Sequence, residues 1–84
     1  MPFYVYILHS QEKEKFYIGF SSDIAERLVR HNKKSKGFTG TSKDWVLVYQ
    51  EEFDTKTAAL LREKQIKSWK SSKKIRELIA LNND

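Results

Sequence analysis

A chain of 84 residues can build one small hydrophobic core and is too short for two, so residues 1–84 are expected to form a single domain. The absence of cysteine excludes disulfide bonds and thiolate metal sites. No apolar run approaches the ~20 residues of a membrane-spanning helix, and the N-terminus lacks the basic-then-apolar layout of a signal peptide. We therefore expect a soluble, cytoplasmic protein with no membrane partner.

The positive charge of the chain is unevenly distributed. Sixteen Lys and Arg face eleven Asp and Glu, a formal net charge of +5, and the basic residues gather in residues 27–36 and 62–76. Basic clusters attract polyanions because binding releases counterions. The clusters favour nucleic acid as a partner, although lysines that only solvate helix surfaces would give the same pattern.

Two strands open the chain. Residues 3–8 (FYVYIL) and 16–20 (FYIGF) are rich in aromatic and β-branched side chains, which is typical of strands. Residues 10–15 are too few for the crossover that a parallel pair needs, so an antiparallel hairpin is predicted. Side chains alternate between faces, so Tyr6 and Tyr17 each lie opposite the aliphatic residues of their strand. If those faces coincide, the two phenols share one region.

A helix is predicted to follow from about Asp23. Asp23 can cap it, and Glu26 completes a capping-box pattern. Ile24 and Leu28 are four residues apart and mark the inner stripe of the helix. Residues 33–44 contain two glycines and several Ser and Thr, which predicts a loop.

The rest of the chain predicts one strand and two helices. Residues 45–49 (WVLVY) form the strand, which is apolar on both faces. Asp54 or Thr55 can cap a helix that runs to about Trp69, and a third helix begins at the serines 71–72. The order β-β-α-β-α-α predicts an α+β fold: a small, three-stranded, mainly antiparallel sheet packed by helices.

The last two helices have apolar stripes. In the second helix this stripe consists of Ala58, Ala59, Ile66 and Trp69. Arg62 interrupts the stripe, and the pattern gives no reason for it. In the third helix the inward residues are Ile75, Leu78 and Ile79.

Arg27 and His31 are candidates for binding a phosphate. They are four residues apart, hence neighbours on one helical face at the rim of the apolar stripe. The planar fork of Arg27 can bind a phosphate, and His31 can donate to that phosphate or take a proton. Ordinary polar residues on an exposed helix would give the same spacing, just as Tyr6 and Tyr17 are also typical of half-buried packing in strands.

Glu63 is a candidate metal ligand. It lies at the edge of the apolar stripe of the second predicted helix. Mg²⁺ often uses one or two protein carboxylates and keeps several waters, so a single glutamate is a sufficient anchor. The alternative is a salt bridge to Arg62, Lys64 or Lys67.

Taken together, these residues resemble the GIY-YIG nucleases, and in particular their short, stand-alone bacterial members with a single domain. The motif YVY at 4–6 and, after ten residues, the motif YIG at 17–19 are similar to the pair that names the family. Arg27-x-x-x-His31 follows in the next helix. Glu63 comes after the third strand, where the family carries its metal-binding glutamate.

The resemblance implies a divalent-metal-dependent endonuclease that hydrolyses phosphodiester bonds in nucleic acid, DNA rather than RNA. Its implied catalytic residues are Tyr6, Tyr17, Arg27 and His31, with Glu63 as the ligand of one Mg²⁺ or Mn²⁺. Tyr6 would activate or orient the attacking water, and Tyr17 would position that water or the scissile phosphate. Residues expected to contact the substrate are Gly19, Arg30, Lys43 and Lys67.

One departure from the family pattern keeps other functions open. Several members carry an asparagine after the glutamate, and this chain has Ile75 there, with its later asparagines at Asn82 and Asn83. Ser71 or Ser72 is the candidate substitute. The alternatives are a non-catalytic module that keeps the fold and binds nucleic acid, and a protein-interaction module. The sequence does not set the oligomeric state.

Overall fold

The computed structural model describes residues 2–32 and 45–81, with His31 and Asn32 described only as part of their helix. The predicted loop 33–44, with Lys43, therefore lies outside the described residues, as do Asn82 and Asn83. The elements follow the predicted order β-β-α-β-α-α: β1 (Phe3–Ser10), β2 (Lys15–Ser21), α1 (Ile24–Asn32), β3 (Val46–Phe53), α2 (Lys56–Ser68) and α3 (Ser72–Leu81). None of the described helices is both long enough and apolar enough to cross a membrane.

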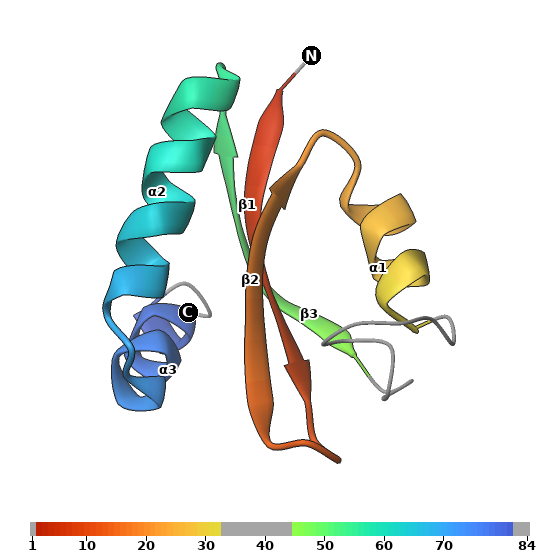
Figure 1. Cartoon of the computed structure of the whole chain (residues 1–84), viewed down its shortest axis with the longest axis vertical. Helices are drawn as coiled ribbons and strands as arrows, with labels where there is room; N and C mark the ends of the chain where they lie inside the picture. Colours follow the sequence, from red (N-terminus) through yellow and green to blue (C-terminus); the bar gives the residue numbers. More distant parts are fainter. Residues whose placement is uncertain (1, 33–44, 82–84) are drawn as a thin grey trace.

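The three strands form one antiparallel sheet in the order β2-β1-β3. The helices cover both faces of this sheet, with α1 on one face and α2 and α3 on the other (Figure 1). The central strand is β1, which is why its side chains from Val5 to Leu8 are all buried. The predicted α+β fold is confirmed, and the sheet is wholly antiparallel.

The hairpin register confirms that the two tyrosines share a face. Tyr6 pairs with Gly19 and Leu8 pairs with Tyr17, so the side chains of these residues lie on the side of the sheet that α1 covers. The opposite face carries the aliphatic residues of both strands, including Ile7 opposite Ile18.

Each face of the sheet has its own apolar cluster. Under α2 and α3, Val5, Ile7, Ile18 and Tyr49 pack with three helix residues, namely Ala59, Ile66 and Ile75. Under α1, the cluster is smaller: Tyr6, Leu8 and Trp45 are buried, and Tyr17, Ile24 and Leu28 pack against them. The predicted inner stripes are confirmed for α1 and α3, and for α2 at Ala59, Ile66 and Trp69 but not at Ala58, which is outside the cluster.

The last strand extends further than predicted. Strand β3 continues past Tyr49 to Phe53, through the polar residues 50–52, because it pairs with β1 along this length. Trp45 precedes the strand, although its side chain is buried. Val46 and Leu47 remain exposed, which fits an edge strand with few neighbours.

Local capping fixes the start of each helix. At α1, the Glu26 amide donates to Asp23 Oδ1 at 3.1 Å, as predicted, but the Glu26 carboxylate binds Arg30 at 3.0 Å instead of closing a capping box. The Asp23 amide donates to Ser21 Oγ at 3.0 Å. Thr55 caps α2, because its Oγ1 accepts from the Ala58 amide at 3.2 Å.

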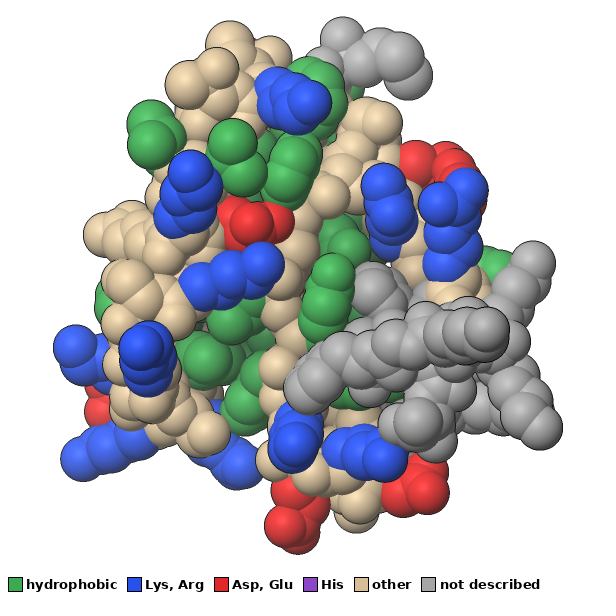
Figure 2. All heavy atoms as spheres, in the orientation of Figure 1, with side chains coloured by type: hydrophobic (Ala, Val, Ile, Leu, Met, Phe, Trp, Pro, Cys, Tyr) green, Lys and Arg blue, Asp and Glu red, His purple; other side chains and the backbone are tan. Residues whose placement is uncertain are grey.

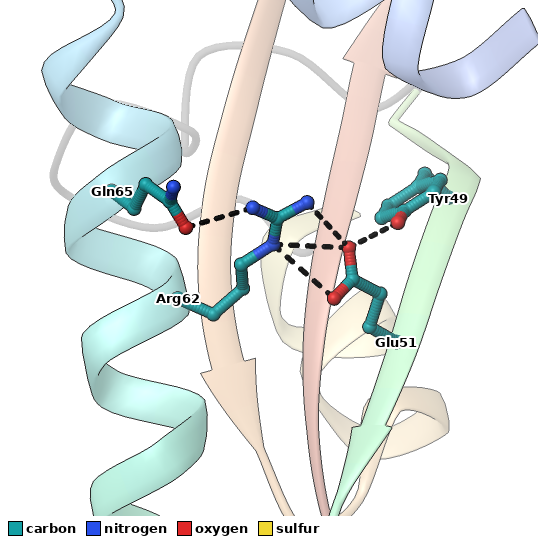
Figure 3. A network of polar contacts seen from close by, with 4 residues as sticks. All are labelled: Tyr49, Glu51, Arg62 and Gln65. Carbon is teal, nitrogen blue, oxygen red and sulfur yellow. Dashed lines mark hydrogen bonds and ion pairs between the residues drawn. The ribbon is translucent and has the colours of Figure 1, made fainter. Parts of the chain in front are cut away.

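Arg62, which interrupts the stripe of α2, joins this helix to β3. Its Nε and Nη2 donate to the Glu51 carboxylate at 3.1–3.2 Å, and its Nη1 donates to Gln65 Oε1 at 2.8 Å. The Tyr49 hydroxyl donates to the same carboxylate, and the guanidinium lies 5.7 Å from the ring centre of Trp69. Figure 3 shows this network spanning helix and strand. Arg62 is therefore a structural residue.

Candidate active site

A pocket of about 460 Å³ lies at the β2 edge of the sheet, where residues from both faces meet. Because β2 is an edge strand, α1 approaches it from one face of the sheet and α2 from the other (Figure 1). We call this site the β2-edge pocket. Its lining residues are Phe3, Tyr6, Tyr17, Gly19, Phe20, Ser21, Ser22, Arg27, Lys56 and Glu63.

The two tyrosines form one wall of the pocket. Tyr6 is buried on the central strand, and Tyr17 is half-buried on the edge strand. Their ring centres are 6.3 Å apart with the planes tilted by 34°. The Tyr17 ring also meets Trp45 edge-on at 6.5 Å, and such aromatic contacts hold a ring in one orientation.

Gly19 makes room for the Tyr6 ring. A Cβ atom at this position would lie 2.8 Å from Tyr6 Oη, 2.9 Å from Tyr6 Cζ and 3.1 Å from Tyr17 Cε1. These distances are too short for carbon contacts, so any larger residue would displace the buried Tyr6 side chain. The glycine thus acts by leaving space for the phenol.

The pKa of the Tyr6 hydroxyl is raised to about 12, mainly by burial. Tyr17 and Glu63 contribute to this rise, while the positive charge of Arg27 opposes it. Arg27 therefore favours the phenolate, but its effect on the pKa is smaller than that of burial. Tyr6 is a neutral hydroxyl near neutral pH, able both to donate and to accept a hydrogen bond.

Helix α1 brings Arg27 to the pocket but not Arg30. Arg27 is exposed at the rim, where its guanidinium can reach a ligand. His31 follows one turn later on the same helical face. Arg30 does not line the pocket, and its side chain is paired with Glu26 on the exposed surface.

Helix α2 brings Glu63 into the same pocket from the opposite face of the sheet. This residue is only 8% exposed, and its Oε1 accepts an ion pair from Lys67 Nζ at 3.3 Å. The salt bridge to Lys67, one of the alternatives that the sequence offered, is therefore present, and Glu63 also lines the pocket. Arg62 is committed to Glu51 instead.

The donor set at Glu63 fits a cation that needs few protein ligands. Among the described residues, no group of three His, Cys, Asp or Glu side chains is close enough together to hold a metal ion. A site for Zn²⁺ or Ca²⁺ built from protein ligands alone is thus not formed by these residues. One carboxylate facing a pocket of this size fits Mg²⁺ or Mn²⁺, whose other ligands would be waters and substrate oxygens.

Three polar residues of the pocket lining were missed by the sequence analysis. Lys56 lies seven residues before Glu63, hence two turns away on the same face of α2, and this spacing was a usable signal. Ser21 and Ser22 join β2 to α1, and nothing in their spacing distinguishes them from other turn serines.

The position of the missing asparagine lies in the core. Ile75 is 7% exposed and packs with the cluster under α2 and α3. Ser71 and Ser72, the candidate substitutes, line a neighbouring pocket and not the β2-edge pocket. Helix α3 therefore contributes no described side chain to the β2-edge pocket.

Known proteins share both this sequence pattern and this fold. The family of the GIY-YIG catalytic domain matches residues 2–76. A UPF0213 protein of Staphylococcus saprophyticus is 38% identical over 74 residues, 87% of this chain and 89% of the relative, and one of Staphylococcus haemolyticus is 35% identical with the same coverage. The solution NMR structure of a UPF0213 protein from Bacillus halodurans is similar, with a TM-score of 0.60 and 28% identity, covering 96% of this chain and 85% of that chain.

The family match covers both tyrosine motifs, the α1 arginine and the α2 glutamate that meet in the pocket. The similar solved structure supports the same α+β arrangement over nearly the whole chain. The chain therefore belongs to the GIY-YIG family, and its catalytic domain indicates a phosphodiesterase of the nuclease type with a nucleic-acid substrate.

Proposed function

We propose that the protein is a divalent-metal-dependent endonuclease that hydrolyses phosphodiester bonds in nucleic acid, DNA rather than RNA, at the β2-edge pocket. The observation that carries this proposal is the meeting of Tyr6, Tyr17, Arg27 and Glu63 in one pocket. A nuclease needs a place for a cation, positive charge for the phosphate and a group that orients water. These four side chains supply all three.

Glu63 would hold the cation. One Mg²⁺ or Mn²⁺ bound there supplies positive charge that polarises a phosphate oxygen and lowers the pKa of a bound water. The Lys67 side chain is half exposed, so its ion pair with Glu63 can open at little cost when a cation arrives. Burial of the carboxylate strengthens its attraction for a cation relative to a glutamate in open water.

Tyr6 would orient the attacking water as a neutral hydroxyl. Its raised pKa, about 12, makes a phenolate base scarce at neutral pH. A hydroxyl fixed by burial and by ring packing can still accept a hydrogen bond from water and set its direction of attack. Tyr17, on the neighbouring strand, would hold that water or the scissile phosphate.

Arg27 would bind the phosphate oxygens and neutralise the charge that develops on them. Lys56 lies at the start of α2 on the same pocket and adds a second positive group. His31, one turn beyond Arg27, would assist by hydrogen bonding or proton transfer.

Cleavage assays test this assignment directly. The purified protein is incubated with labelled single-stranded, branched and duplex DNA and with RNA, each with Mn²⁺ and with EDTA. We expect DNA cleavage that needs the metal, and a fall in kcat of about 10²-fold or more in Tyr6→Phe. Tyr4→Phe is the matched control, since Tyr4 does not line the pocket. Cleavage that persists in EDTA, or an undiminished Tyr6→Phe enzyme, contradicts the mechanism.

A non-catalytic module that binds nucleic acid is the second candidate. Two observations favour it: the Glu63 carboxylate already has a lysine partner, and Ile75 fills the asparagine position with a buried apolar side chain. This candidate predicts binding that weakens steeply with salt, and no cleavage with any divalent metal.

A further inference from the structure

A second pocket lies beside the β2-edge pocket, between β2 and the junction of α2 and α3. Its volume is about 390 Å³, within the range of pockets that accept a small ligand. Tyr17, on the edge strand β2, lines both pockets. We call this second site the α2–α3 pocket.

Three lysines line the α2–α3 pocket: Lys15 on β2, Lys67 on α2 and Lys70 between α2 and α3. Glu14 is the one acidic side chain in its described lining, so the pocket carries a net positive charge. On the face drawn in Figure 2, basic side chains lie over α2, over α3 and near the β1–β2 turn, with hydrophobic surface between them. This composition suits an anionic ligand with an apolar part.

The backbone conformation of Lys70 is a second reason to assign its side chain a role in the pocket. Lys70 has φ 49°, the left-handed conformation that glycine adopts at the ends of helices without steric cost. A lysine there meets the conformational demand less well than glycine would, yet its side chain lines the pocket. Conformation alone does not account for a lysine at this position.

Lys67 connects the two pockets. Its Nζ binds Glu63 of the β2-edge pocket at 3.3 Å, while its side chain also lines the α2–α3 pocket. Consider a nucleic-acid strand with one phosphate in the β2-edge pocket, which Arg27 and Glu63 line. Such a strand would pass over Tyr17 and Lys67 before it reached Lys15 and Lys70. Backbone phosphates repeat along a nucleic-acid strand, so one strand can occupy both pockets.

We propose that the α2–α3 pocket is a second phosphate subsite for the substrate strand, with Lys15 and Lys70 binding a phosphate beside the scissile one. The subsite rests on the proposed nuclease function and adds the path of the strand across the enzyme. Lys15 and Lys70 position the substrate through its backbone, so the contact is independent of base sequence.

Binding without metal tests the subsite apart from catalysis. A short fluorescein-labelled oligodeoxynucleotide is titrated with protein in EDTA, and its anisotropy is followed at several salt concentrations. We expect Lys70→Gly and Lys15→Gln each to weaken binding by about fivefold. Each variant should also make the dependence of log Kd on log salt shallower by about 1. Glu14→Gln should tighten binding, because it removes the opposing charge.

Two controls distinguish the loss of a local contact from a general effect of net charge and from unfolding of the variant. Lys64→Gln and Lys73→Gln remove exposed lysines of α2 and α3 that do not line the pocket, and they should change the affinity by less than twofold. Lys70→Gly suits the left-handed backbone, so its melting temperature should stay level or rise while binding weakens. Equal effects from pocket and control lysines overturn the subsite, as does a wild-type protein that does not bind the oligonucleotide.

A cleavage assay then locates the substrate phosphate that the subsite binds. Oligonucleotides with one neutral methylphosphonate linkage, moved stepwise from the cut, should show one position where KM rises. In Lys15→Gln/Lys70→Gly this rise should vanish, since the partner of that phosphate is gone. Pocket-specific binding without any cleavage leaves the subsite standing and contradicts the nuclease. Cleavage with no position-dependent rise in KM keeps the nuclease and contradicts the subsite.

Discussion

Glu51 is a partly buried glutamate and Glu63 a buried one, and their surroundings are opposite. The Glu51 carboxylate is bound by the Arg62 guanidinium from α2 and by the Tyr49 hydroxyl, so its oxygens are committed. The Glu63 carboxylate forms an ion pair with the half-exposed Lys67 and faces a pocket. Both lie near a tyrosine whose pKa is raised to about 12.

The difference shows how one residue type serves structure or chemistry. A carboxylate enclosed by arginine and tyrosine loses little by being buried, but it has no oxygen to offer a new ligand. A carboxylate with an exchangeable lysine partner keeps its charge available. Glu51 therefore fastens α2 to β3, whereas Glu63 can exchange its partner for a cation.

The largest expected effect comes from neutralising Glu63. Glu63→Gln should lower the cleavage rate by roughly 10³-fold, because several kcal/mol of metal-derived stabilisation is lost. The melting temperature should change little, since glutamine is nearly isosteric. Cleavage assays with Mn²⁺ measure the rate and a thermal melt measures the melting temperature. Calorimetric titration with Mn²⁺ should show weakened metal binding in Glu63→Gln.

Glu51→Gln is the counterpart of this change. It should reduce the free energy of unfolding while the folded protein still binds Mn²⁺. If both substitutions impaired Mn²⁺ binding equally, the division between a structural and a catalytic glutamate would be wrong.

The next effect in size concerns the anchor of α2. Arg62→Gln should lower the free energy of unfolding by about 2 kcal/mol, a value between those of exposed and fully buried ion pairs. Arg62 is 23% and Glu51 25% exposed, so solvent screens the pair only in part. Urea unfolding followed by tryptophan fluorescence measures the change. Lys64→Gln on the same helix is exposed and should shift stability by less than ~0.5 kcal/mol.

The smallest effect is a pH dependence set by Tyr49. Burial, followed by the hydrogen bond to Glu51, raises the pKa of Tyr49 from 10.0 to about 12. The folded state therefore holds this proton more tightly than the unfolded state does. The stabilisation is complete below pH 10 and is lost as the pH rises towards 12.

Comparing the wild type with Tyr49→Phe isolates this contribution. Their difference in unfolding free energy should shrink by about 1 kcal/mol between pH 9 and pH 11, when both are unfolded with urea. A difference that stays constant, or that grows with pH, would show that Tyr49 is not held in its protonated form by the fold.

The sequence by itself determined the local structure. Alternation in the first two strands placed Tyr6 and Tyr17 each opposite the aliphatic face of its strand, and the observed register joined those faces. Asp23 marked where α1 begins, and Thr55 was one of two candidates for the start of α2. These signals depend on neighbours within one hairpin or one helical turn, which is why they can be read without coordinates. The family motifs supplied the candidate residues in order.

Only the tertiary structure decided which of those residues meet. Glu63 reaches Tyr6 because β2 lies at the edge of the sheet and α1 and α2 approach it from opposite faces. The partner of Arg62 lies eleven residues away on β3, so its place in the apolar stripe made sense only once helix and strand were packed. The raised pKa of Tyr6 likewise comes mainly from burial between β1, β2 and α1. Burial and long-range pairing are properties of the packed chain, and no local pattern encodes them.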